Sequence, residues 1–275
     1  MLLKVHEVDK SFRQGGFFTA GKKPILKGVS LEICGGECLG LIGESGSGKS
    51  TLGRMLIGIE QPDRGEVLFE GKNIYRSAGW GKQPDWRRKI SAVFQDYTSS
   101  VNPRFSVSKI ITEPLHTHCL ATGPEAVARA VYLLEKVGLS GDYLKRYPHQ
   151  LSGGQLQRVC IARALATNPA FILLDEPVSS LDVSVQVQVM DLLDSLKAEF
   201  RLSYLFISHD LAAVAYLCDR ALFFAEGRIV EEVARMEELG QVKEAYSRKL
   251  LHSVMDFSEQ AKDYCCGHEE ESRMA

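Results

Sequence analysis

Short apolar runs alternate with longer stretches of helical periodicity along most of the chain. Residues 2–8 alternate between apolar and polar types as a strand does, and residues 38–42 form a short apolar run that ends at Gly43. Residues 49–57 carry apolar side chains at helical spacing, so we predict a helix there. The apolar side of this helix consists of Leu52, Met55, Leu56 and Ile59.

The same pattern continues through the rest of the chain. Further strands are predicted at residues 66–70, 91–94, 171–174, 204–207 and 221–225, and helices at residues 125–137, 183–199 and 211–217. Strands that alternate with helices imply a mainly parallel sheet with helices on both faces. The helical pattern from about residue 107 to 148 lies between two strands and predicts a helical subdomain. Residues 77–84 are predicted to form a surface loop, and residues 258–275 a polar tail.

Composition and charge exclude several classes of protein. The chain has 275 residues, of which 45% are hydrophobic and 25% charged, as in an ordinary globular protein. The net charge of −2 gives no sign of a nucleic-acid partner, which would usually require a basic face. Seven scattered cysteines and an N-terminus without a signal-peptide layout favour a reducing, cytosolic location. No stretch approaches the ~20 apolar residues that span a bilayer, because Asp219 and Arg220 interrupt the best candidate, residues 212–225.

The sequence after the apolar run at 38–42 matches a phosphate-binding loop. It reads Gly43-Glu44-Ser45-Gly46-Ser47-Gly48-Lys49-Ser50, which fits G-x-x-x-x-G-K-[ST] in the required strand, loop and helix order. Backbone N–H groups at the helix start can converge on phosphate oxygens, since glycines let the chain approach closely. Lys49 is expected to hold the β- and γ-phosphates, Ser50 to ligate Mg²⁺ and Thr51 to contact the α-phosphate. A chance match to a glycine-rich turn is the alternative.

Polar residues also follow three other predicted strands. Asp175 ends a buried apolar strand, where a carboxylate is costly unless a cation or hydrogen bonds offset it. A water bound to Mg²⁺ fits that need, and Glu176 points the other way, so it can polarise the water that attacks the γ-phosphorus. Gln95 and His209 follow strands as well, which places them at the carboxyl edge of the sheet. Taken alone, His209 would be a surface or hydrogen-bonded histidine, and Gln95 would carry no signal.

A second anion site is predicted far downstream of the first. The run Gln150-Leu151-Ser152-Gly153-Gly154-Gln155-Leu156 contains a helix start, and Ser152 is a natural N-cap. A helix end with free N–H groups carries partial positive charge and attracts anions. The alternative is a capped helix with a glycine-rich turn and no ligand.

The order and spacing of these motifs resemble the nucleotide-binding domain of ATP-binding cassette (ABC) proteins. The resemblance implies a P-loop NTPase of the α/β class, with a mainly parallel sheet core, an antiparallel β subdomain and a helical subdomain at about residues 100–165. It covers residues 1–235 and leaves residues 236–275 as a short C-terminal extension with a mobile tail. In ABC ATPases two domains pack head to tail, and the signature helix of one closes over the ATP that the other binds.

The resemblance assigns nucleotide contacts to several residues. Residues 43–51 correspond to the Walker A loop, and Leu151-Ser152-Gly153-Gly154-Gln155 to the signature that meets the ATP of the partner domain. Asp182 belongs to the D-loop. Phe12 is expected to stack on adenine, although a place in the core is an equal alternative, and Phe17 and Phe18 lie nearby.

The resemblance also assigns the catalytic and metal-binding residues. Asp175 corresponds to the Walker B aspartate, which holds Mg²⁺ through water, and Glu176 to the catalytic glutamate. Gln95 corresponds to the Q-loop glutamine, a Mg²⁺ ligand with a catalytic role, and His209 to the switch histidine. No chemically required position is replaced, so the chain is expected to be a working ATPase that uses ATP and Mg²⁺.

A longer stretch points to one group within the ABC proteins. Val93-Phe94-Gln95-Asp96-Tyr97-Thr98-Ser99-Ser100-Val101-Asn102-Pro103-Arg104, with Glu113-Pro114-Leu115, is similar to ATPase subunits of the oligopeptide, dipeptide and nickel importer family. Ala245-Tyr246-Ser247-Arg248-Lys249-Leu250-Leu251 resembles that family's His-Pro-Tyr-Thr-x-x-Leu-Leu. Such importers combine two related ATPases with two integral membrane permeases and an extracytoplasmic substrate-binding protein. The chain is then a peripheral subunit on the cytoplasmic face of the membrane, paired with a second homologous ATPase or with itself.

Two features bear on the cargo. One ATPase type of this family carries a C-terminal cysteine cluster for iron–sulfur binding, and only Cys265-Cys266 occurs here, so the chain resembles the shorter type. Gln95-Asp96-Tyr97-Thr98 in place of Gln-Asp-Pro-Tyr favours nickel or metallophore import, with dipeptide or oligopeptide import as the alternative. A metal-binding tail built from Cys265, Cys266 and His268 is less favoured than a solvated terminus, because the spacing suits no tetrahedral site.

Other ABC classes fit less well. A DNA-repair or chromosome-structure ATPase needs long coiled-coil insertions, which this chain lacks. A ribosome-acting translation factor carries two cassettes in one chain, whereas this chain has one set of motifs. An export ATPase without its own membrane part stays open as an alternative.

Overall fold

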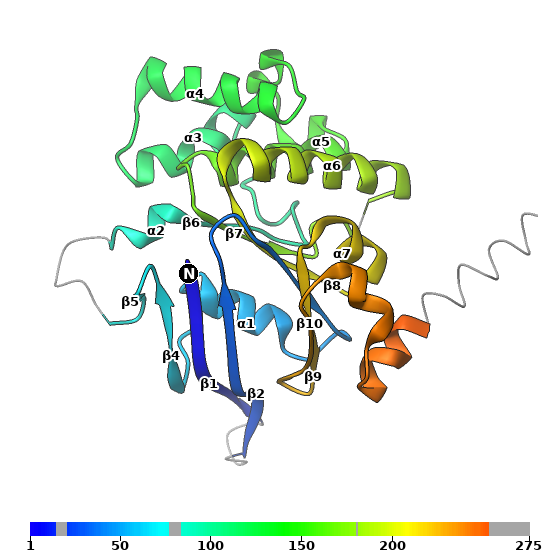
Figure 1. Ribbon diagram of the computed structural model, residues 1–275. Helices are drawn as coiled ribbons and strands as arrows, with labels where there is room; N and C mark the ends of the chain where they lie inside the picture. The colour runs from blue at the N-terminus through cyan, green and yellow to red at the C-terminus, as the bar shows by residue number, and fades with distance from the viewer. Residues whose placement is uncertain (15–20, 77–83, 180, 253–275) are drawn as a thin grey trace, which may run out of the picture.

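A computed structural model of the chain describes residues 1–14, 21–76, 84–179 and 181–252. Figure 1 shows a central sheet with a layer of helices on one side and, on the other, a helix and a second sheet. The predicted loop at 77–84 (Pro84 apart), the predicted tail at 258–275, and the residues Phe17, Phe18, Cys265, Cys266 and His268 lie outside the described residues.

The central sheet has six strands in the order β10-β9-β3-β8-β7-β6. They are β3 (Cys38–Ile42), β6 (Ile90–Val93), β7 (Phe171–Asp175), β8 (Ser203–Ser208), β9 (Arg220–Ala225) and β10 (Arg228–Val233). The pairs β3–β8, β3–β9, β6–β7 and β7–β8 are parallel, whereas β10 runs antiparallel to β9. Parallel strands covered on both faces read as continuous apolar runs, which is why β3, β7 and β8 were visible in the sequence.

Helices cover one face of this sheet. They are α3 (Val107–Thr117), α4 (Gly123–Lys136), α5 (Gly153–Leu165), α6 (Val183–Phe200) and α7 (Leu211–Leu217). Leu174 and Phe206 point into the core beneath these helices. The neighbouring residues Leu173 and Leu205 point to the opposite core, because successive side chains of a strand face opposite ways. The 3₁₀ helices η1 (Gly141–Lys145) and η2 (Pro148–Gln150) connect α4 to α5.

The opposite face packs against α1 (Lys49–Leu56) and an antiparallel sheet of order β2-β1-β4-β5. Its strands are β1 (Leu3–Gln14), β2 (Gly21–Ile33), β4 (Arg64–Phe69) and β5 (Lys72–Asn73). The short helix α2 (Trp86–Lys89) precedes β6. This sheet is the antiparallel β part that the resemblance implied.

The C-terminal part of the described chain returns to the central sheet. After β10 the chain forms η3 (Met236–Gln241) and a helical segment at residues 245–252, drawn in orange at the right of Figure 1. Val242, which joins them in the sequence, is buried. In the described ranges, no helix has the length and apolar character to cross a bilayer. The cysteines of these ranges, Cys34, Cys38, Cys119, Cys160 and Cys218, are free thiols.

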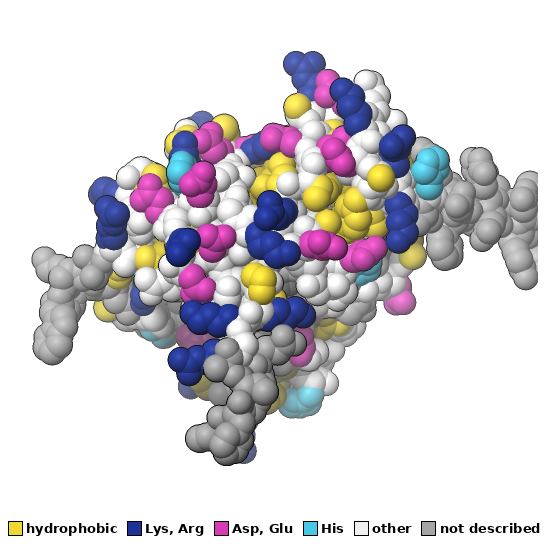
Figure 2. Space-filling view, turned by 90° about the horizontal axis from the view of Figure 1, so that it is seen from below, with side chains coloured by type: hydrophobic (Ala, Val, Ile, Leu, Met, Phe, Trp, Pro, Cys, Tyr) yellow, Lys and Arg dark blue, Asp and Glu magenta, His cyan; other side chains and the backbone are white. Residues whose placement is uncertain are grey.

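The sequence predictions are largely confirmed at the level of elements, with two differences. The prediction that Ile59 lies on the apolar side of α1 is wrong, because the helix ends at Leu56 and Ile59 is 61% exposed. Strands β2 and β10 were not predicted, and neither were the two-residue strand β5 and the four-residue helix α2. Strands β2 and β10 are partly exposed, so polar residues dilute their apolar alternation. On the face seen in Figure 2, Lys and Arg side chains alternate with Asp and Glu side chains.

Candidate functional site

Four adjacent parallel strands deliver the candidate residues to one edge of the central sheet. Gly43 follows β3, and the strands beside it are β8, then β7, then β6. His209 comes directly after β8 and Glu176 directly after β7, while Gln95 lies two residues beyond β6. Ligands of open α/β sheets bind outside the carboxyl ends of the strands, so this edge is the expected site.

The phosphate loop is shaped by two of its glycines. A Cβ at Gly43 would collide with the backbone carbonyl of Phe224 on β9, so only glycine permits this close approach. Gly48 has φ +112°, a left-handed conformation that other residues rarely adopt. Gly48 is also the N-cap of α1 and offers no side chain to cap the helix. The first N–H groups of α1 are therefore left without a side-chain acceptor, as an anion site requires.

Lys49 lies inside the loop rather than in solvent. Its Nζ donates hydrogen bonds to the carbonyl oxygens of Gly43 (2.7 Å) and Glu44 (2.8 Å), and the residue is 5% exposed. Burial lowers the pKa of the Lys49 ammonium, and the carboxylates of Glu176 and Asp175 act in the opposite direction. The positively charged ammonium of Lys49 therefore lies beside the backbone N–H groups of the phosphate loop.

The loop fits a phosphate group. The Ser47 Oγ is buried and has no hydrogen-bond partner among the described residues. Such an orphaned polar atom costs free energy unless a ligand or water satisfies it. Together with the uncapped start of α1 and the Lys49 ammonium, it forms a set of donors for an oligophosphate.

Ser50 and Asp175 form the second part of the site. The Ser50 Oγ donates a hydrogen bond of 3.1 Å to the Asp175 Oδ1, which brings the helix start and the end of β7 together. Burial raises the pKa of the Asp175 carboxyl, although the Ser50 hydrogen bond lowers it. A buried carboxylate beside a hydroxyl suits a hard divalent cation such as Mg²⁺.

Replacing Asp175 by Asn tests the cost of this buried charge. Because the folded protein raises the pKa of Asp175, the ionised carboxylate destabilises the folded state near pH 7. We expect Asp175→Asn to raise the unfolding temperature without ligands by about 2–4 °C, which corresponds to ~1 kcal/mol. The extra stabilisation that Mg²⁺ adds to bound nucleotide should disappear. Thermal unfolding with nucleotide, with and without Mg²⁺, measures both effects, and an unchanged Mg²⁺ effect would contradict the role of Asp175.

Glu176 and His209 meet at the same edge. The Glu176 Oε2 lies 3.3 Å from the His209 Nδ1, and the side chains are 16% and 58% exposed. The Glu176 N–H donates to the Ile207 carbonyl (2.9 Å) while the residue has φ +49°. Six other non-glycine residues in the described ranges have a similar positive φ, so this angle describes the turn after β7 and does not mark a catalytic position. No residue type near Glu176 predicted this positive φ.

Gln95, Asp182 and Phe12 lie at the surface. Gln95 is exposed, and Asp182 is the exposed N-cap of α6. Phe12 is 39% exposed on β1, and the Lys10 Nζ lies 5.2 Å from its ring centroid, so the core alternative for Phe12 is wrong. Phe12 pairs with Lys23 on β2, two residues before Ile25, which contacts Gly48. An exposed ring therefore lies on the strand pair that borders the phosphate loop.

The predicted second anion site has the expected helix cap. The Ser152 Oγ accepts from the Gln155 N–H (3.3 Å), and the Gln155 Oε1 accepts from the Ser152 N–H (3.1 Å). Such a capping box leaves the N–H groups of Gly153 and Gly154 without an intrahelical partner. Gly153 lies against the Tyr97 hydroxyl and Gly154 against Val185.

The two anion sites are separate within the chain. In the described part of the protein, no hydrogen bond joins residues 152–155 to residues 43–51. In Figure 1, α5 belongs to the upper helical layer, whereas α1 lies on the other side of the central sheet. The two predicted anion sites therefore lie in different surroundings within one chain.

Sequence reasoning missed three contacts around the site. Tyr97 lies against Gly153, and the Gly227 N–H donates to the Ser47 carbonyl (3.1 Å). The Tyr246 hydroxyl accepts from the Glu44 N–H in the phosphate loop and donates to the Phe224 carbonyl on β9. The resemblance of residues 245–251 to a family motif was the one sequence feature that drew attention to Tyr246, and it did not predict which residues Tyr246 contacts.

Comparisons with known proteins agree with this geometry. A family model described as "ABC transporter" matches residues 26–179. The chain is 44% identical over 259 residues to the metal-staphylopine import system ATP-binding protein CntF of Staphylococcus aureus (strain NCTC 8325 / PS 47), covering 93% of this chain and 100% of that protein. It is 42% identical to the oligopeptide transport ATP-binding protein AppF of Bacillus subtilis (strain 168), covering 92% of this chain and 78% of AppF.

Solved structures give the same result. The dimeric, post-hydrolysis state of the ATP-binding cassette MJ0796, bound to ADP and Pi, aligns with a TM-score of 0.74 and 31% sequence identity. The alignment covers 85% of this chain and 99% of that one.

Proposed function

The chain belongs to the ABC transporter family, and from this premise we propose that it is the ATP-hydrolysing subunit of an importer for nickel or a metal-chelate complex. The observation that carries the ATPase part is the convergence of Lys49, Ser50, Asp175 and Glu176 at one sheet edge. Similarity to CntF over its full length supports the cargo class.

The chain's own groups account for ATP binding. The N–H groups that start α1 and the Lys49 ammonium bind the phosphates, and Lys49 exchanges its two carbonyl partners for the β- and γ-phosphate oxygens. Ser50 and, through water, Asp175 hold Mg²⁺, and we also assign Gln95 as a ligand. Mg²⁺ supplies positive charge to the β- and γ-phosphates. Thr51 contacts the α-phosphate, and Phe12 stacks on adenine.

Hydrolysis then depends on positioning a water molecule. Glu176 accepts a proton from the water that attacks the γ-phosphorus, as a general base at the edge of the sheet. His209, 3.3 Å from Glu176, orients that carboxylate and senses the γ-phosphate.

Two ATPase subunits are proposed to complete each site between them. Because residues 152–155 make no hydrogen bond to the phosphate loop of their own chain, we propose that a head-to-tail partner brings its signature to this loop. Asp182, exposed beside that signature, then lies at the same interface. The dimeric state of the similar cassette MJ0796 supports such pairing, and the partner is a second homologous ATPase or a second copy of this chain.

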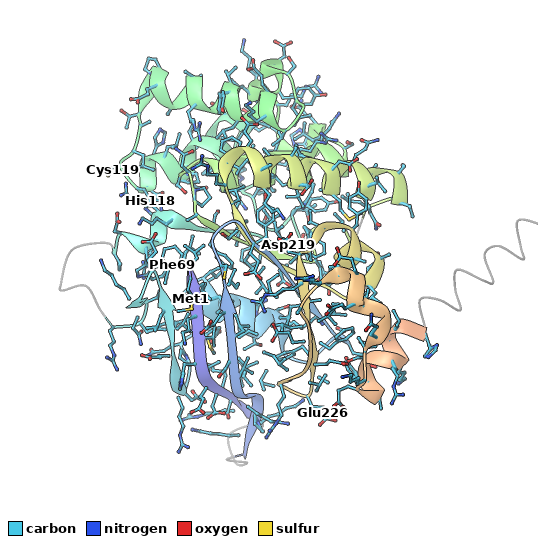
Figure 3. All side chains as sticks on the ribbon, in the orientation of Figure 1. Met1, Phe69, His118, Cys119, Asp219 and Glu226 are labelled. Carbon is cyan, nitrogen blue, oxygen red and sulfur yellow. The ribbon has the colours of Figure 1, made fainter. Side chains whose placement is uncertain are left out.

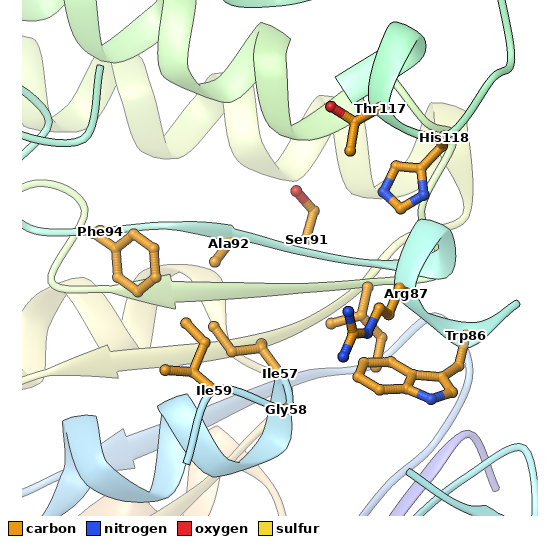
Figure 4. A pocket seen from close by; sticks show the side chains of 11 residues that line it. Ile57, Gly58, Ile59, Trp86, Arg87, Ser91, Ala92, Phe94, Thr117 and His118 are labelled. Atoms are coloured by element: carbon orange, nitrogen blue, oxygen red, sulfur yellow. The ribbon is translucent and has the colours of Figure 1, made fainter. Parts of the chain in front are cut away.

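We propose that a permease contacts this subunit at a cavity beside Gln95, and that conformational changes of the ATPase reach the permease there. The cavity has a volume of about 490 Å³ and lies between the end of α1, α2, β6 and the end of α3 (Figure 4). Phe94, which precedes Gln95, and the exposed Ile59 line it, so its wall is partly apolar. A short cytoplasmic helix of a permease fits such a site, and the Q-loop and residues 101–115 would transmit its movement.

The division of the chain follows the same proposal. Residues 1–235 form the ABC ATPase domain, with a helical subdomain at about 100–165, and residues 236–275 form an extension. The subunit lies at the cytoplasmic face of the cell membrane, bound to two integral permeases. An extracytoplasmic binding protein supplies the cargo.

Peptide import is the second candidate, because AppF is a relative of nearly the same coverage. ATP hydrolysis by membranes that contain this chain, its permeases and the second ATPase distinguishes the two. We expect binding protein loaded with a Ni²⁺ chelate to stimulate turnover, and binding protein loaded with dipeptide to leave it unchanged. Stimulation by dipeptide alone would reverse the cargo assignment. Indifference to both would contradict the importer assignment and leave the ATPase intact.

A further inference from the structure

The C-terminal helix contacts the phosphate loop directly. Tyr246, in the helical segment 245–252, accepts a hydrogen bond at its hydroxyl from the Glu44 N–H (2.9 Å). The same hydroxyl lies 3.4 Å from the Phe224 carbonyl oxygen, to which it can donate. Phe224 is the residue against which Gly43 packs. A residue of the C-terminal extension thus bonds both the loop and the strand behind it.

The helix that carries Tyr246 is anchored at its start. The Glu231 carboxylate on β10 accepts from the backbone N–H groups of Lys243 (2.6 Å) and Glu244 (3.2 Å). Val242 is 8% exposed, and Leu251 packs against the core beneath the helices. These contacts fix the backbone that positions the Tyr246 ring, so its hydroxyl is not a chance surface contact.

Tyr246 and Lys49 hold the same peptide of the loop from opposite ends. The N–H of the Gly43–Glu44 peptide bonds to Tyr246, and the carbonyl of that peptide, on Gly43, accepts from the Lys49 Nζ (2.7 Å). Farther along, the Gly227 N–H donates to the Ser47 carbonyl from the β9–β10 turn, which Glu226 marks in Figure 3. The loop is therefore held from outside at two points, before and after Gly46.

We propose that Tyr246 is a positioning residue for the phosphate loop and that the C-terminal extension sets nucleotide affinity through it. The inference rests on the proposed ATP site. Without the hydroxyl, the Glu44 N–H loses its acceptor, and the peptide can rotate together with the carbonyl that bonds Lys49. The loop N–H groups and the ammonium then no longer converge on one phosphate position. The hydroxyl of Tyr246 makes the hydrogen bond that positions the loop, and the ring holds the hydroxyl in place.

The test is equilibrium binding of MgADP to the full chain, which avoids turnover. We expect Tyr246→Phe to weaken MgADP binding by about three- to tenfold, the loss that one hydrogen bond produces. Tyr246→Ala should weaken it to a similar extent. A merely structural role would lower the unfolding temperature of both variants and leave the dissociation constant of folded molecules unchanged.

Tyr216→Phe is the matched control. Tyr216, like Tyr246, is a helical tyrosine with a hydrogen-bonded hydroxyl. Its partner is the Asp191 side chain, and it lies on α7 with 54% of its surface exposed. Its substitution should leave MgADP binding unchanged. Equal affinity of wild type and Tyr246→Phe overturns the inference, as does weakening by Tyr246→Ala alone. Absence of saturable binding by the wild type would instead overturn the proposed ATP site itself.

Discussion

Replacement of Glu176 by Gln is expected to lower ATP turnover by at least about 100-fold, the usual contribution of a general base. Gln keeps the size and hydrogen-bonding shape of the side chain but cannot accept the proton of the attacking water. The substitution also preserves the contact with His209, because an amide can bond to the imidazole at the 3.3 Å separation. Binding of ATP should therefore persist while hydrolysis stops.

A second consequence makes this variant informative. If two subunits close around ATP and part only after hydrolysis, Glu176→Gln should remain as an ATP-bound dimer. Size-exclusion chromatography with MgATP measures the dimer, and a phosphate-release assay measures turnover. Glu125→Gln, an exposed carboxylate in the first turn of α4, is the control and should behave as wild type. ATP turnover by Glu176→Gln at the wild-type rate would contradict the role of Glu176 as the general base.

Replacement of Lys49 by Met is expected to weaken binding of MgATP by about 10- to 100-fold and to abolish measurable hydrolysis. The ammonium makes charge-assisted hydrogen bonds, each worth ~1.5–3 kcal/mol, and a neutral thioether cannot replace them. Met retains the unbranched stem that fills the space at this 5% exposed position. Burial lowers the pKa of Lys49, so loss of the charge should not destabilise the fold.

Nucleotide binding by calorimetry and thermal unfolding without ligand separate the two effects. The expected result is weak binding with an unchanged or higher unfolding temperature. Lys72→Met, an exposed lysine on β5, is the control for loss of one positive charge. Binding of MgATP by Lys49→Met at wild-type strength would show that the phosphates do not occupy the loop.

Local chemistry explains why so much of the site was predictable. The run at 43–50 specifies a phosphate loop by itself, since its glycines and lysine act over a few adjacent residues. Ser152 predicts a helix cap for the same reason, and the structure confirms the cap. The buried strand that ends at Asp175 is visible as an apolar run, which made the carboxylate at its end conspicuous.

Long-range contacts explain what was missed. The prediction for Ile59 was wrong because helical periodicity does not reveal that α1 ends at Leu56. The exposure of Phe12 depends on the pairing of β1 with β2. Strand β2 was not predicted because Pro24 and several lysines interrupt its apolar alternation. The positive φ of Glu176 results from the way the chain leaves β7, which no residue type announces.

Short-range patterns in the sequence predicted the chemistry of this protein: a phosphate loop, a carboxylate pair after a buried strand, and a capped helix start as a second anion site. Each of these features depends on residues that are neighbours in the sequence, so it can be recognised without knowledge of the fold. Which loops meet at the carboxyl edge of the central sheet follows from the strand order β3-β8-β7-β6, a feature of the folded chain. The tertiary structure also placed Tyr246 on the Glu44 N–H, 202 residues away. Contacts at such separation arise from packing, and packing is a property of the whole chain.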